Sequence, residues 1–124
     1  MKTSRNLLQI AQETIENTLA SLPDEIRSLA EALPLILEGR PSPEILDEEV
    51  DEDILGLFVG DSLEDLGESA APMPGQILLF YENIWDFSEE NIEIYKEEVR
   101  ITFLHELGHY LGWDERDLFE RDLE

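Results

Sequence analysis

The sequence predicts an α+β fold in which helices at the two ends of the chain flank a small sheet. Near each end, apolar residues recur at three- and four-residue spacing, which is the period of an amphipathic helix. Between them lie three short apolar runs bounded by glycine, proline or acidic residues, as strands are. We find no internal repeat and no domain boundary, so we expect residues 1–124 to form a single domain.

The chain is strongly acidic, with 31 Asp and Glu against 8 Lys and Arg and a formal charge of −23. Phosphate binding depends on clustered Lys and Arg, so this balance argues against nucleic acid as a partner and against docking on anionic lipids. Hydrophobic residues still make up 42% of the chain, which is enough for a core. Because such a charge density opposes compaction, we expect salt or divalent metal to raise the melting temperature.

The chain contains no cysteine, which excludes disulfides and thiolate metal ligands. The basic residues near the N-terminus are not followed by an apolar run, so the sequence does not predict a signal peptide. No stretch approaches the roughly 18 apolar residues of a membrane helix. We therefore expect a cytoplasmic protein that has no membrane partner.

The first helix is predicted from an apolar stripe that ends at a proline. Thr3 or Ser4 can cap this helix, and Pro23 closes it. The acidic pair 24–25 can then open a short second helix that reaches about Ala32. The stripe consists of Leu7, Leu8, Ala11, Ile15, Leu19 and Leu22.

Three strands are predicted, at Leu35 to Glu38, Leu55 to Gly60 and Gln76 to Asn83, of which the last gives the strongest signal. The acidic connection over 44–53 lacks the glycine and the ligand spacing of an EF-hand loop, so we interpret it as a solvated loop or helical turn. Residues 61–75, which hold several glycines, prolines and acids, are predicted to be a loop.

A long helix is predicted to begin after Ser88 as N-cap and to end at Gly112. Glutamates at 89, 90 and 93 would favour the positive end of its dipole. Residues 114–124 can form at most a short helix beyond it. The expected buried side consists of Ile94, Ile101, Leu104, Leu107, Gly108 and Leu111.

The two histidines of the chain lie four residues apart on this helix, at His105 and His109, with Glu106 directly after the first. On a helix both imidazoles face the same side, one turn apart, where both can reach a single Zn²⁺. Glu106 projects about 100° away from His105, beside the metal rather than on it. There it can take a proton from a zinc-bound water and pass it to a leaving amine. This is the H-E-x-x-H arrangement of metallopeptidases.

A catalytic zinc needs a third protein ligand and one open position. Only 15 residues follow His109, so a ligand from a separate downstream helix is barely possible. In the pattern H-E-x-x-H-x-x-G-x-x-H, Gly112 falls on the glycine and Glu115 on the third ligand. A carboxylate there suits zinc, so we predict Glu115 as the ligand, with Asp114 as the alternative. Asp114 or Asp117 could otherwise orient the metal ligands by hydrogen-bonding to them.

On these residues the chain resembles the minimal zincins, a small bacterial family of zinc metallopeptidases with a zincin-like fold. The matching segments are 55–60, 74–80 and 99–117, and their order also agrees with the N-terminal helix, so we expect the resemblance to cover the whole chain. It implies an N-terminal helix, a small mixed sheet of about three strands and an active-site helix. It also implies that an edge strand, either Gln76 to Asn83 or Leu55 to Gly60, would pair with an extended peptide.

Two aromatic residues near the motif remain open to two interpretations each. Tyr110 lies within about 40° of Glu106 on the helix, where it could line the site and hold an oxyanion or simply pack. Trp113 is expected to be a hydrophobic plug rather than a substrate contact. The methionine turn of metzincins has no counterpart, because the methionines here are Met1 and Met73.

Three functions follow from these observations. The first is a zinc-dependent peptidase that acts on a peptide or protein substrate, with Glu106 as its base. The second is a zinc-binding protein of the same fold without peptidase activity, acting as an acidic interaction module. The third is an acidic binding module without metal, such as an adaptor or a mimic of nucleic acid. The sequence favours the first and leaves the oligomeric state open.

Overall fold

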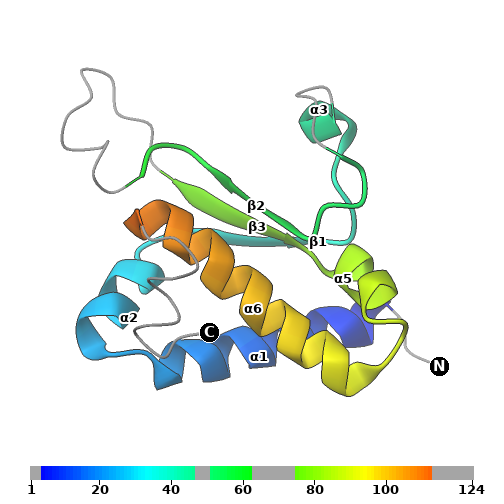
Figure 1. The fold of residues 1–124 in the computed structure, drawn as a ribbon, viewed down its shortest axis with the longest axis horizontal. Coiled ribbons are helices and arrows are strands. Elements are labelled where there is room, and N and C mark those ends of the chain that lie inside the picture. The colour runs from blue at the N-terminus through cyan, green and yellow to red at the C-terminus, as the bar shows by residue number, and fades with distance from the viewer. Residues whose placement is uncertain (1–3, 47–50, 63–74, 113–124) are drawn as a thin grey trace.

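The computed structural model describes residues 4–46, 51–62 and 75–112 (Figure 1). These residues form helices around a three-stranded sheet, which agrees with the predicted α+β class. The elements are α1 (Ser4–Ser21), α2 (Asp24–Glu31), β1 (Leu35–Glu38), α3 (Pro43–Leu46), β2 (Gly56–Val59), β3 (Gln76–Phe80), α5 (Tyr81–Phe87) and α6 (Ile92–Leu111).

The sheet is mixed and has the order β1-β3-β2. β1 runs parallel to β3, with Leu35 opposite Ile77, whereas β2 runs antiparallel to β3, with Gly56 opposite Leu79. β3 is therefore the central strand, and the expectation that it could serve as a free edge is wrong. Within the described residues the edges are β1 and β2, of which β2 contacts α6.

The core lies between the sheet and the helices on one side of it (Figure 1). α6 contacts β2 and β3, and α1 packs against α6 from the other side. Alternation along β3 points Ile77 and Leu79 into this core, where both are 1% exposed. Tyr95 of α6 ties the helices together, because its buried hydroxyl donates a 2.8 Å hydrogen bond to the carbonyl of Leu7.

The N-terminal predictions are confirmed in their main lines. Four residues of the predicted apolar stripe are buried in the core, namely Leu7, Ala11 and Ile15 of α1 and Leu22 directly after it. Pro23 separates α1 from α2, and α2 ends with Ala32 as its C-cap. Of the two alternatives for the acidic connection, a solvated loop or a helical turn, its first residues form a helical turn, α3. Thr3, the loop over 63–74 and the segment from Trp113 onward lie outside the described residues.

The predicted strand from Gln76 to Asn83 is three residues too long, because Tyr81 begins α5. The apolar run continues past Phe80, but its next buried residues, Asn83 and Ile84, are consecutive and belong to a helix. In this helix Asn83 is buried, and its amide donates to the carbonyls of Glu52 (2.9 Å) and Ile54 (2.8 Å), contacts that the apolar pattern does not indicate.

The predicted start of the last helix is also wrong. Ser88 is the C-cap of α5, and its buried hydroxyl donates to the carbonyl of Ile84 at 2.7 Å. The N-cap of α6 is Asn91, whose side chain accepts from the amides of Glu93 and Ile94.

The buried side of α6 is rotated relative to the predicted one. Ile94 is 46% exposed, because the neighbouring Tyr95 faces the core instead. Leu104, Leu107 and Gly108 are buried as expected, whereas Ile101 and Leu111 are only half-buried. The remaining buried residues of the helix are Val99, Thr102, Phe103, Glu106 and Tyr110. Gly112 ends the helix as predicted, with φ of 76°.

No helix in the described part of the chain combines the length and the apolar character that crossing a bilayer requires.

Candidate metal centre

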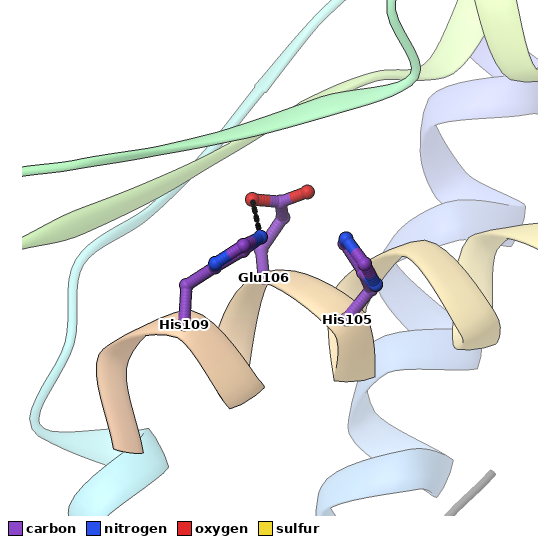
Figure 2. A group of neighbouring side chains, drawn as sticks. All are labelled: His105, Glu106 and His109. Carbon is purple, nitrogen blue, oxygen red and sulfur yellow. Dashed lines mark ion pairs between the residues drawn. The ribbon is translucent and has the colours of Figure 1, made fainter. Parts of the chain in front are cut away.

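His105 and His109 lie one turn apart in the C-terminal half of α6. Their ring centroids are 4.9 Å apart, and the ring planes are nearly perpendicular at 87°. Figure 2 shows both imidazoles and the Glu106 carboxylate extending from the side of the helix that faces the strands. One ligand atom from each of these three residues lies within 4.8 Å of the others.

The donor set fits zinc better than a hard cation such as calcium. Two imidazole nitrogens with carboxylate oxygens are a ligand set that Zn²⁺ takes, whereas calcium takes oxygen ligands alone. Oε1 of Glu106 lies 3.9 Å from Nε2 of His109, beside the ring and beyond hydrogen-bond distance (Figure 2). The predicted third ligand, Glu115, and its alternative, Asp114, lie outside the described residues, as does Asp117.

Glu106 is held differently from the histidines. The side chain of Glu106 is 10% exposed, whereas that of His109 is 55% exposed. Burial raises the pKa of the Glu106 carboxyl, and the nearby His109 and His105 and a backbone hydrogen bond from Phe58 oppose this rise. A carboxylate with a raised pKa accepts a proton more readily at neutral pH, which suits a general base.

The contact with Phe58 follows from the register of β2. The carbonyl of Leu55 accepts from the amide of Phe80 at 2.9 Å, so the backbone of residue 55 faces β3. Backbone groups alternate in direction along an antiparallel strand, and those of Gly56 and Phe58 therefore face away from β3. The outward N–H of Phe58 is thus directed to the side on which Glu106 accepts it.

An open recess lies between β2 and α6, beside the histidines. This recess, hereafter the Glu106 recess, has a volume of about 380 Å³. Its lining residues are Leu57, Phe58, Gly60, Ser62, Glu106 and His109. The strand can lie this close because position 56 is glycine: a Cβ there would lie 2.7 Å from Cγ2 of Thr102 on α6.

Tyr110 packs in the core rather than lining the recess. It is 6% exposed, and its ring centroid lies 5.8 Å from that of Phe58. The structure therefore supports the packing interpretation, in which Tyr110 holds Phe58, and shows no contact that would make it an oxyanion donor. Trp113 lies outside the described residues.

Sequence reasoning missed the contribution of β2 to this site, namely the N–H of Phe58 and the walls formed by Gly60 and Ser62. A backbone donor has no signature in the sequence. Gly56 and Gly60 were a usable signal, because glycine in or beside a strand often marks the close approach of another backbone.

Comparison with known families agrees with this geometry. A family model described as zincin-like metallopeptidase matches residues 30–124. The chain belongs to the zincin-like metallopeptidase family. The match begins at Ala30, so α1 and most of α2 lie outside it, and the expected coverage of the whole chain holds only from there on. A search of curated proteins gives no match.

Membership in the zincin-like family and the His-Glu-His cluster on α6 together indicate a metal-binding centre. The family match spans all three strands and the helix that carries the motif. The elements that form the Glu106 recess therefore lie within the matched residues.

Proposed function

We propose that the chain is a zinc-dependent peptidase that hydrolyses peptide bonds in the Glu106 recess. The observation that carries this proposal is the position of a buried carboxylate, Glu106, between two histidines and β2, which is an edge strand among the described residues. The family match supports this proposal, because the matched residues include the H-E-x-x-H motif.

His105 and His109 would hold the metal, with Glu115 or Asp114 as the third protein ligand. Zinc, when bound, lowers the pKa of water and polarises a carbonyl. Glu106 takes the proton of the attacking water and returns it to the leaving amine, and the N–H of Phe58 keeps its carboxylate in place. Burial of Glu106 keeps bulk water from competing for its charge.

The open edge of β2 would hold the substrate in an extended form. The outward groups of this strand are the N–H and C=O of Gly56 and the C=O of Phe58, because the N–H of Phe58 is taken by Glu106. An extended peptide can pair with these groups as an added strand. Its backbone would then pass the recess, where the histidines and Glu106 lie.

Metal content is the first test of this proposal. We expect about one zinc per chain in tag-free protein, measured by mass spectrometry, because His105, Glu106 and His109 form a single ligand cluster. His109→Ala should lose the metal, since a single histidine and carboxylates hold zinc weakly. Absence of metal in both proteins, even after incubation with zinc, would end the zinc hypothesis.

Glu106→Gln separates metal binding from catalysis. This variant should keep its zinc, because the histidines are intact, but hydrolysis of a broad peptide library should fall by at least about 100-fold. Full activity in the variant would remove Glu106 from the role of base. A wild type that is loaded with zinc and cleaves nothing would instead support a zinc-binding interaction module.

A further inference from the structure

A second cavity lies at the other end of β2 from the Glu106 recess. It has a volume of about 490 Å³ and is hereafter called the Phe87 cavity. Glu52 and Asp53, which precede β2, form one wall, and Asp86 and Phe87 of α5 form another. Arg40, which follows β1, also lines it. In Figure 1 this is the end of the sheet at which α3 and α5 lie.

The shape of the Phe87 cavity is fixed by a buried amide. Asn83 is 4% exposed, and its Nδ2 donates to the carbonyls of Glu52 and Ile54 at 2.9 and 2.8 Å. Its Oδ1 accepts from Arg40 at 2.7 Å. The segment before β2 is therefore tied to α5, and the hollow between them is built into the fold.

The lining of this cavity has an excess of negative charge. Arg40 pairs with Asp86 at 3.0 Å, which neutralises one of the three carboxylates. No ion pair found among the described residues involves the side chain of Glu52 or Asp53. As far as the described residues show, the cavity therefore offers two uncompensated carboxylates to a cation.

Phe87 adds an aromatic surface to this charge. Its side chain is 60% exposed, although a phenyl ring is normally buried in a fold with a core of this size. An exposed ring beside carboxylates suits a guanidinium or ammonium group, which can stack on the ring face while it pairs with the acids. The combination distinguishes this cavity from the solvated acidic surface elsewhere.

We propose that the Phe87 cavity receives an arginine or lysine side chain of the peptide that pairs with β2. This inference rests on the proposed function, because β2 connects the cavity to the Glu106 recess. β2 runs from the cavity toward the recess, and antiparallel pairing is the more stable arrangement. The basic residue therefore lies on the C-terminal side of the cleaved bond, about four to six residues away, which is the separation along the chain between residues 52–53 and 57–58.

Binding to an inactive enzyme tests this proposal without turnover. Zinc-loaded Glu106→Gln protein is titrated with short neutral peptides in which one arginine is moved through successive positions. Each peptide has a partner with citrulline, a neutral isostere, at the same place. At the favoured position we expect arginine to bind about tenfold more tightly than citrulline, as the loss of a charge-assisted contact predicts.

Two matched double variants and one single variant locate the effect. In the double variant Glu52→Gln with Asp53→Asn, the arginine peptide should bind at most about twice as tightly as the citrulline peptide. We expect the same of Phe87→Ala, because each change removes part of the proposed contact. Glu25→Gln with Glu31→Gln changes the net charge equally on α2, at exposed positions, and should keep the preference. Equal loss in both double variants would show a general charge effect and would overturn the proposal.

The remaining outcomes separate this inference from the peptidase itself. Equal binding of arginine and citrulline peptides at every position, or no binding of either, overturns the proposal. If wild-type protein cleaves peptides without any preference for a basic residue, the peptidase stands and the basic subsite falls. If it cleaves nothing but Glu106→Gln still prefers arginine through Glu52 and Asp53, the subsite stands and the peptidase falls.

Discussion

At Glu106, burial and neighbouring charges act on the pKa in opposite directions, and burial dominates. Because its pKa in the folded protein lies above the ordinary value of 4.5, the folded state binds the proton more tightly than the unfolded state. The stability of metal-free protein should therefore fall as the pH rises from 4.5 through the raised pKa.

The variant Glu106→Gln should remove this pH dependence, since an amide does not titrate. In metal-free protein we expect the variant to be more stable than wild type at pH 7 and no more stable below pH 4.5, the ordinary glutamate pKa. Urea unfolding across this range measures the difference. A difference that does not change with pH would show that burial does not perturb this carboxyl.

Two other glutamates, Glu89 and Glu90 in the turn before α6, have left-handed backbone angles, with φ of 54° and 59°. This region strains residues other than glycine by about 1 kcal/mol. Glu90→Gly should therefore stabilise the protein slightly, by up to about 1 kcal/mol. The same change in the body of α6, Glu98→Gly, should destabilise it by about 1 kcal/mol. Thermal unfolding of both variants gives the sign, and destabilisation by both would contradict the strained turn.

At the residue scale, the part of the candidate site that lies on one helix could be predicted from the sequence. His105, Glu106 and His109 lie within five positions, so helical periodicity alone predicts that they meet. The contact between Glu106 and Phe58 depends on the position and register of a strand far away in the chain, which no local pattern encodes. The same reason explains why the Phe87 cavity could not be predicted, because its walls come from segments around three different elements.

At the scale of elements, the approach of β2 to α6 decides whether the site exists. Gly56 permits it, and Gly56→Ala should push the strand away, because the new Cβ would lie 2.7 Å from Cγ2 of Thr102 and 3.2 Å from the carbonyl of Leu78. We expect a loss of about 1–3 kcal/mol in unfolding free energy, as for other overpacked cores. Peptidase activity should fall as well, because the N–H of Phe58 moves with the strand.

A second substitution tests this explanation. Thr102→Ser removes the methyl group that the new Cβ meets, so the double variant should recover part of the lost stability and activity. Denaturant unfolding and peptide hydrolysis measure both. If Thr102→Ser leaves the Gly56→Ala variant unchanged, the clash with α6 is not the cause of the loss.

The predicted bounds were correct where apolar spacing determines an element. They were wrong where polar contacts determine its start or end. α1, α2, β1 and β2 follow their apolar patterns. The end of β3 and the start of α6 depend instead on Asn83 and Asn91, which bond to backbone groups. Since Ser88 and Asn91 are both good cap residues, the sequence alone favoured the wrong one.

At the scale of the whole molecule, the order of the strands in the sheet was less predictable than their number. Three strands were expected, but the order that puts β3 between β1 and β2 depends on pairing between distant segments. Among the described residues that order makes β2 the edge strand beside α6, which is why we propose this edge for peptide binding. The single-domain prediction for residues 1–124 stays a prediction.

The net charge of −23 acts on the molecule as a whole, and its effect can be separated from that of the metal. Repulsion among surface acids is screened over about 10 Å at 0.1 M salt, so monovalent salt should raise the melting temperature progressively without saturating at one equivalent. Zinc should act differently, because a bound ion stabilises the folded state by mass action at one site.

These two effects predict different responses of one variant. In His109→Ala protein the gain from sodium chloride should equal that of wild type, because the surface charge is almost unchanged, whereas the gain from stoichiometric zinc should disappear. Calorimetry of both proteins, with each salt in turn, measures the four shifts in melting temperature. If zinc stabilises the variant as much as wild type, the ion acts on the acidic surface and not through the histidines. If sodium chloride has no effect on either protein, self-repulsion does not limit the stability of this fold.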